Sequence, residues 1–376
     1  MKKLAHRWEV IVAAVLGVGC GPIAVDVGDL RDAGPAGATS DGSGAVGSGG
    51  ARDVPIDPGF GDAGRGASGG GGVSGRGNGG AGANGFGSAG RSNGPVDQPG
   101  LFDSDPSKSD CEGFATNWLL FDSDRADGER HIFSMRGDGS GIFMLAAPGE
   151  DPALSPDGTT LVYVVDGALM ARQLPNGTVT PLGISGDQPA WSADGSRLAY
   201  HADNGIQILD WSTFTSRTLI TCSQCRYGGY QHPEFVADGS ALVVDRENEI
   251  DRVDLVTGFA EGIVRNWTIT MSHPSASPDV AHVVTTLEGQ SLWVSNYSEI
   301  VNPGEGIRLT PPAELATGPA WGPHDRIAYE QLEDDGERDI AVGDFNTHVR
   351  CVIPGAGDDA NPTWAPEGFD PGGISN

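Results

Sequence analysis

Six residues that each stand directly before a recurring proline are the first candidates for chemistry in this sequence. They comprise two imidazoles, a carboxylate, two amides and a glycine: Asp151, Gln188, His232, His273, Gly318 and Asn361. Imidazole, carboxylate and amide groups gathered in one ring can bind a divalent cation or a polar ligand. The alternative is that the two His-Pro pairs only satisfy a backbone group at the entrance of a blade. We favour this alternative, because residue types without geometry are weak evidence for a site.

The elements that must position these residues follow from a phrase that begins at each proline. Pro189–Gly195 has the typical form, a proline, then an aromatic residue two positions on, then Asp-Gly. The six prolines are 37, 44, 41, 45 and 43 residues apart, a period typical of β-propeller blades. Short β-rich runs follow each phrase, and Asp-Gly favours a tight turn between strands. Each unit is therefore predicted to be a four-stranded antiparallel blade.

The two ends of the repeat region are incomplete in complementary ways. Residues 118–148 supply three strands without a phrase, whereas residues 362–368 supply a phrase without strands. A blade composed of both ends would close the ring and remove exposed sheet edges. The predicted fold is thus all-β, a six-bladed propeller closed by a composite blade. Since each innermost strand is expected to begin at its proline, the six preceding residues should surround one mouth of the central channel.

The repeats resemble those of the TolB family, whose phrase reads Pro-x-Trp-Ser-Pro-Asp-Gly. The resemblance covers about residues 118–368 and implies a six-bladed propeller of the bacterial envelope, although such repeats serve many functions. TolB also carries an N-terminal α/β domain, and a glycine-rich segment stands in that place here. The role of TolB is therefore not carried over to this chain.

A second resemblance supplies the enzyme alternative. The channel would be similar to that of the oligogalacturonate lyases, related propellers with a metal in a His-lined channel. His232 and His273 are the residues that match this feature. The resemblance implies a metal-assisted, polysaccharide-lyase-like enzyme with its site at the central channel.

The N-terminus has the pattern of a secretory signal peptide, which we assign to residues 1–19. Three basic residues precede an apolar run over 10–18, which is too short to span a bilayer as a helix. Gly19-Cys20 resembles the lipobox of bacterial lipoproteins, although Gly17 stands where that family usually has Leu. The resemblance implies lipid attachment at Cys20 and export to the periplasm or cell surface, anchored in the outer membrane. The alternative is a plain signal peptide in which Cys20 is incidental.

Residues 20–110 are predicted to be a disordered tether, because 27 of the residues from 21 to 100 are glycine and large side chains are scarce. Such a segment cannot bury enough apolar surface to offset its ordering entropy. The propeller is assigned to residues 111–370 and a short tail to 371–376.

The four remaining cysteines are expected to be oxidised in an exported chain. Cys111 precedes the first strand and Cys351 lies in the last complete unit, so closure of the ring should pair them. Cys222 and Cys225 would form the second pair. The alternative, a metal bound by Cys222, Cys225 and His232, lacks the fourth ligand of a structural zinc site.

The formal charge of the chain is -28, and residues 111–376 carry 14 basic and 39 acidic groups. This balance excludes a nucleic-acid binder that relies on phosphate contacts and favours basic or cation-bridged partners. The predicted function is a non-catalytic binding or scaffold propeller tethered in the cell envelope, which recognises an envelope protein or a cell-wall ligand. We expect a monomer without a cofactor and leave open a divalent cation at the channel.

Overall fold

The computed structural model describes residues 100–102, 111–203, 205–223, 225, 229–265, 269–297 and 306–373. Cys20, the predicted signal peptide and most of the predicted tether lie outside the described residues. The described part is built from β-strands, apart from three short 3-10 turns at Glu112–Phe114, Pro323–Asp325 and Pro371–Gly373. None of its helices is long and apolar enough to span a membrane.

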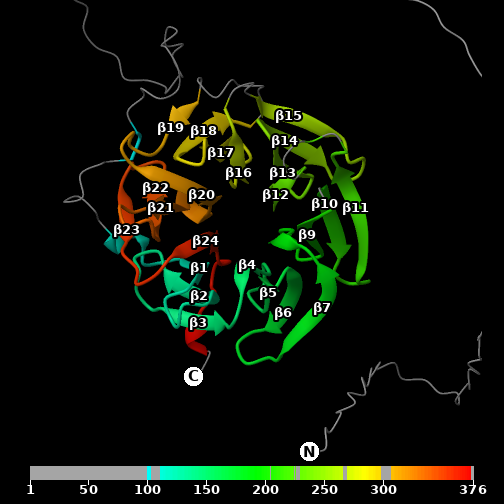
Figure 1. Cartoon of the computed structure of the whole chain (residues 1–376), viewed down its shortest axis with the longest axis horizontal. Helices are drawn as coiled ribbons and strands as arrows, with labels where there is room; N and C mark the ends of the chain where they lie inside the picture. Colours follow the sequence, from blue (N-terminus) through cyan, green and yellow to red (C-terminus); the bar gives the residue numbers. More distant parts are fainter. Residues whose placement is uncertain are drawn as a thin grey trace, which may run out of the picture. The chain divides into compact units, whose positions relative to one another are not determined.

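The strands form six four-stranded antiparallel sheets arranged as blades around a central channel (Figure 1). We number the blades along the chain, starting from the one that contains β1. Blade 1 contains β24 (Asp359–Trp364), β1 (Trp118–Ser123), β2 (His131–Arg136) and β3 (Phe143–Ala146). Blade 2 contains β4 (Glu150–Leu154), β5 (Thr160–Val165), β6 (Ala168–Gln173) and β7 (Val179–Ser185). Blade 3 contains β8 (Asp187–Trp191), β9 (Arg197–Ala202), β10 (Gly205–Asp210) and β11 (Thr215–Thr221).

The other three blades follow the same order, with the innermost strand first. Blade 4 contains β12 (Gln231–Phe235), β13 (Ala241–Arg246), β14 (Glu249–Asp254) and β15 (Ala260–Arg265). Blade 5 contains β16 (Met271–Ala276), β17 (His282–Leu287), β18 (Ser291–Asn296) and β19 (Ile307–Arg308). Blade 6 contains β20 (Leu315–Trp321), β21 (Arg326–Leu332), β22 (Arg338–Asp344) and β23 (Arg350–Ile353).

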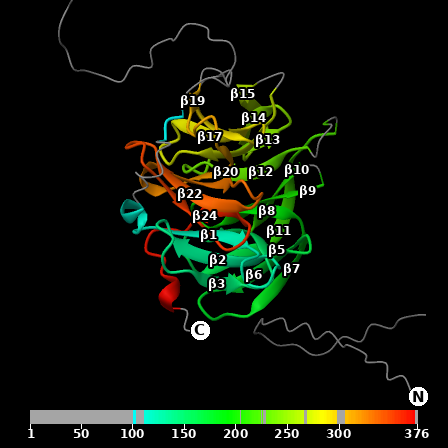
Figure 2. The ribbon, with the colours of Figure 1, turned by 60° about the vertical axis from the view of Figure 1, so that its left-hand side comes forward.

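The composite blade predicted from the repeat is confirmed. β24 pairs antiparallel with β1, with Leu119 opposite Trp364 and Leu120 opposite Thr363 (Figures 1 and 2). The indole Nε1–H of Trp364 also donates to the carbonyl of Ala320 in blade 6, at 3.0 Å. The last strand of the chain thus joins blade 1 to blade 6 and closes the ring.

The core is divided among the junctions between neighbouring blades, and each junction holds its own apolar cluster. Between blades 2 and 3, for example, Val162 and Val164 pack with Leu198 and Tyr200. Because both faces of a blade contact a neighbour, the second strands are apolar on both sides. In β5, Leu161–Val164 is buried throughout, which explains why these strands read as continuous apolar runs rather than as alternating ones.

Residues 100–102 differ from the prediction, which placed them in the tether. The N–H groups of Leu101 and Phe102 donate to the carbonyls of Arg308 and Leu309, at 2.9 and 2.8 Å. The Phe102 side chain is 2% exposed and belongs to the apolar cluster between blades 5 and 6. Gly343 makes room for it, since a Cβ there would lie 2.3 Å from Cζ of Phe102. Backbone pairing and burial of one aromatic ring therefore hold this part of a glycine-rich segment against the propeller.

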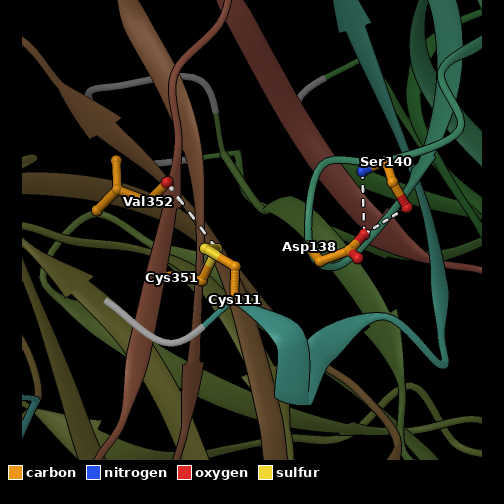
Figure 3. Close-up of a disulfide and its surroundings, with 5 residues drawn as sticks. All are labelled: Cys111, Asp138, Ser140, Cys351 and Val352. Atoms are coloured by element: carbon orange, nitrogen blue, oxygen red, sulfur yellow. Dashed lines mark hydrogen bonds between the residues drawn. A yellow bond between two sulfur atoms is a disulfide. The ribbon is translucent and has the colours of Figure 1, made fainter. Parts of the chain in front are cut away.

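The described residues contain two disulfides, and they are the two pairs expected from the sequence. Cys111–Cys351 joins the turn ahead of β1 to β23 of blade 6, across 240 residues (Figure 3). Cys222–Cys225 closes a short loop between β11 and β12, with a sequence separation of 3. The long bridge thus acts on the same closure as β24, whereas the short one is local.

Candidate functional site

The six residues that precede the phrase prolines occupy equivalent bulges in the six innermost strands. All six have left-handed backbone conformations, with φ between 45° and 57°. They line one end of a cavity of about 560 Å³ that runs along the channel. The innermost strands begin two to four residues before the proline, earlier than predicted. A bulge leaves one residue out of the hydrogen-bond ladder, so proline can sit inside these strands.

The first three bulges are connected by side chains that accept backbone hydrogen bonds from the next blade. The N–H of Asp151 donates to Oδ2 of Asp122 at 3.1 Å, and the N–H of Gln188 donates to Oδ2 of Asp151 at 3.1 Å. The N–H of His232 donates to Oε1 of Gln188 at 2.8 Å. Asp151 and Gln188 therefore have a structural role, because each accepts a backbone hydrogen bond from the next blade.

Two more bulges are held from the second strand of the preceding blade. The N–H of His273 donates to Oδ1 of Asp245 at 3.2 Å, and the N–H of Asn361 donates to Oε1 of Glu330 at 2.9 Å. Gly318 allows the second contact, because a Cβ there would lie 2.8 Å from the same Glu330 oxygen. These hydrogen bonds fix the channel mouth across the boundaries between blades.

The two histidines of the ring lie against each other. Their ring centroids are 3.6 Å apart, and Nδ1 of His232 lies 2.6 Å from Oδ1 of Asp245. Burial, together with the charge of His232, lowers the pKa of His273 to about 3, so His273 is neutral at physiological pH. Among the described residues, no group of three or more His, Cys, Asp or Glu side chains could hold a metal ion.

The carboxylates at this mouth differ in how they are neutralised. Asp122 pairs with Arg130, Glu330 pairs with Arg338, and burial raises the pKa of both carboxyl groups while the arginines oppose it. Asp151 forms no ion pair with any described residue. Burial, with the nearby charge of Asp122, raises the pKa of Asp151 to about 6. Asp151 is thus a channel carboxylate that is ionised near pH 7, and no cationic side chain of the described part of the chain pairs with it.

Glu234 is a further channel carboxyl group that the sequence analysis did not single out. It follows Pro233 on β12, lines the same cavity and is partly exposed to the channel. Burial raises its pKa to about 8, against hydrogen bonds from Ser275 and the backbone of Ala276. The signal was present in the sequence, since the corresponding position holds Ala, Ser or Thr in the other five units.

Glu234→Gln is expected to stabilise the protein at alkaline pH. The carboxyl group binds its proton more tightly in the folded chain than in the unfolded chain, whose pKa is near 4.5. The free energy of unfolding therefore falls as the pH rises from about 4.5 to about 8. Because the Glu234 side chain is partly exposed to water in the channel, we expect less than the full effect of the pKa shift. The free energy of unfolding of the wild type should fall by about 2 kcal/mol more than that of the variant between pH 5 and pH 9. Denaturant unfolding at both pH values measures this difference.

The matched control is Glu337→Gln, which removes an exposed carboxylate in the β21–β22 turn, away from the channel cavity. It should show the same pH dependence as the wild type. A Glu234→Gln curve parallel to that of the wild type would show that this carboxyl group titrates alike in both states.

The fold and this ring define the class of the protein, a six-bladed TolB-like β-propeller closed by both ends of the chain. No protein-family model matches the sequence, and no curated protein matches it. TolB from Acinetobacter baumannii is similar in structure, with a TM-score of 0.57, 18% identity, and coverage of 68% of each chain. The putative TolB from Agrobacterium tumefaciens has a TM-score of 0.51 and 14% identity, with coverage of 66% of this chain and 98% of that one.

The same architecture also occurs outside TolB. A chain of the nidogen/laminin complex has a TM-score of 0.54 and 9% identity, with coverage of 66% of this chain and 98% of that one. In all, 1217 chains of solved structures match this fold. At these identities the similarity shows the fold alone, so any function must be argued from the site.

Proposed function

We propose that this chain is a non-catalytic binding propeller that recognises a basic group of an envelope protein or a cell-wall ligand at the Asp151 mouth of its channel. Asp151 is the observation that carries this proposal, because it is a channel carboxylate without an ion-pair partner among the described residues. Asp122 and Glu330 beside it are each paired with an arginine. The acidic excess of residues 111–376 would attract a basic partner to the propeller.

The geometry favours recognition of one charged group rather than general attraction. The hydrogen bonds between blades hold Asp151 and Gln188 in fixed positions, so a bound ammonium or guanidinium group would meet oriented acceptors. A charge-assisted hydrogen bond to a partly buried carboxylate such as Asp151 is stronger than one at an open surface. Gln188 and Asn361 would supply neutral acceptors around it.

Asp151→Asn is expected to weaken binding of a pentalysine peptide to the full-length chain at least tenfold at pH 7.5 and low salt. The variant keeps the side-chain oxygen that accepts the N–H of Gln188 but removes the charge. Isothermal titration calorimetry measures the affinity. Asp335→Asn, which changes an exposed carboxylate in the β21–β22 turn, is the matched control and should leave the affinity within twofold.

The pH dependence of pentalysine affinity provides a second test of the same site. Because the pKa of Asp151 is about 6, its charge is lost as the pH falls through 6. Wild-type affinity should therefore fall between pH 7.5 and pH 5, and the decrease should be smaller in Asp151→Asn. Equal losses for the Asp151 and Asp335 variants, or no binding of the basic peptide by the wild type, would contradict the proposal.

We further propose that the chain is exported and anchored in the outer membrane through a lipid on Cys20. The basic start, the short apolar run and Gly19-Cys20 support this placement. Cys20→Ser should move the full-length protein from the membrane fraction to the soluble fraction of a bacterial expression host and abolish incorporation of labelled palmitate. Unchanged fractionation and labelling would leave Cys20 without this role.

A further inference from the structure

A groove of about 380 Å³ lies between blades 2 and 3, at the ends of the innermost strands opposite Asp151. Trp191, from the end of β8, and Trp211, from the turn after β10, line it, with ring centroids 4.5 Å apart and planes at 65°. Phe214 continues the series, 6.2 Å from Trp211, and its side chain is 49% exposed. Three aromatic rings thus follow one another outward from the channel rim.

Blade 6 has a corresponding aromatic pair that is covered. Trp321 and Phe345 lie 5.2 Å apart, and the His282 ring packs on both, at 6.1 and 5.7 Å. His282 occupies the first position of β17 in blade 5. The equivalent position in blade 2 is Thr160, because Thr160 and His282 each offer their carbonyl to the serine of their own phrase. Thr160 is too small to cover the neighbouring tryptophans, so the groove in blades 2 and 3 stays open.

Two exposed carboxylates stand at the rim of the groove, Asp157 from blade 2 and Asp194 from blade 3. Each holds its own turn through Oδ1, which accepts from a serine hydroxyl and a backbone N–H. These hydrogen bonds lower both pKa values, that of Asp194 to about 2. Among the described residues, Oδ2 of neither aspartate accepts a hydrogen bond. The groove therefore combines aromatic faces with two oriented, ionised acceptors.

We propose that this groove is a second binding site and that it takes a neutral glycan chain. One face of a pyranose ring consists of C–H bonds, whose partly positive hydrogens suit the negative face of an indole. The hydroxyl groups at the edge of the sugar need acceptors, which Asp157 and Asp194 supply. Aromatic walls with a few fixed polar groups are the usual composition of a small-molecule site. This site lies outside the Asp151 mouth and does not depend on the function proposed for it.

Two other classes of ligand fit the groove less well than a neutral glycan. A polymer of uronic acids would meet the two rim carboxylates and the acidic excess of residues 111–376, so like charges oppose it. A basic side chain would pair with the carboxylates but would cover only one ring at a time. The series Trp191, Trp211 and Phe214 is longer than one such group, which favours a chain of successive rings.

The test measures binding of chitohexaose and cellohexaose to the full-length chain by tryptophan fluorescence and by calorimetry. At least one of these neutral hexasaccharides should bind and change the fluorescence. Trp211→Ala should weaken binding at least tenfold. Thr160→His, which places the residue of blade 5 in blade 2 and covers the tryptophan pair, should do the same. If Thr160→His fails to fold, Trp211→Ala still decides the question.

Matched controls separate this site from the channel. Phe259→Ala changes an exposed aromatic residue outside the groove, and Asp151→Asn changes the channel mouth; both should leave hexasaccharide affinity unchanged. The proposal is overturned if neither hexasaccharide binds at millimolar concentration, or if both groove variants bind like the wild type. It is also overturned if hexagalacturonate binds more tightly than the neutral sugars. Pentalysine binding that is lost in Trp211→Ala, without any sugar binding, would assign the groove to a basic peptide instead.

Discussion

The double variant Cys111→Ala/Cys351→Ala is expected to lose roughly 5 kcal/mol of unfolding free energy. The bridge closes a loop with a sequence separation of 240, and the conformational entropy that a cross-link removes from the unfolded chain increases with loop length. It also links β23 of blade 6 to the segment ahead of β1, the strand of blade 1 that pairs with β24 to close the ring. Guanidinium unfolding of the purified variant and wild type, both in their oxidised form, measures the difference.

The second disulfide provides the control. Cys222→Ala/Cys225→Ala removes a bridge with a sequence separation of 3, so the same reasoning gives a loss of about 2 kcal/mol. Under reducing conditions the wild type and the first double variant should unfold at nearly the same guanidinium concentration. Equal losses from the two double variants would show that loop length does not determine the effect.

Phe102→Ala is expected to cost 3 to 5 kcal/mol, the usual range for removing a fully buried phenylalanine. The ring is 2% exposed, stacks at 6.1 Å on Tyr329 and fills the space left by Gly343. Its loss would leave a cavity between blades 5 and 6 and weaken the pairing of residues 100–102 with the end of β19. Thermal or denaturant unfolding of the full-length chain measures the effect.

The matched control is Phe259→Ala, in which the same substitution is made at a side chain that is 67% exposed. Its effect should lie within about 0.5 kcal/mol. A similarly small effect of Phe102→Ala would mean that the segment before residue 103 contributes little to the propeller.

Much of the fold could be predicted because the same phrase and strand pattern recur in every blade. The phrase prolines gave the number of blades, and the incomplete units at residues 118–148 and 362–368 gave the closure. The pairing of Cys111 with Cys351 followed from that closure alone. Leu101 and Phe102 were missed because two apolar residues in a glycine-rich segment carry no periodic signal, and their partners lie about 200 residues away in the sequence.

The candidate site could be predicted in part, for a different physical reason. Asp151, Gln188, His232, His273 and Asn361 were placed together because each stands at the same position of its repeat. Asp122, Asp245 and Glu330 come from second strands, outside the phrase, and reach the ring across blade boundaries. One difference between equivalent positions, Thr160 in blade 2 against His282 in blade 5, separates the open groove from its covered counterpart. It could be interpreted only from the structure, because the repeat does not show which residues of neighbouring blades meet.

The path of the long disulfide also decides how the propeller would bear a mechanical load applied through its N-terminal segment. The contacts of Leu101 and Phe102 with blades 5 and 6 would meet such a pull first. Once they yield, a chain without the bridge would transmit the pull along the backbone into β1, the strand that pairs with β24. With Cys111 linked to Cys351, the tension is diverted into β23 of blade 6 before it reaches β1. The β1–β24 pairing that closes the ring would then be shielded from the load, which blade 6 would bear instead.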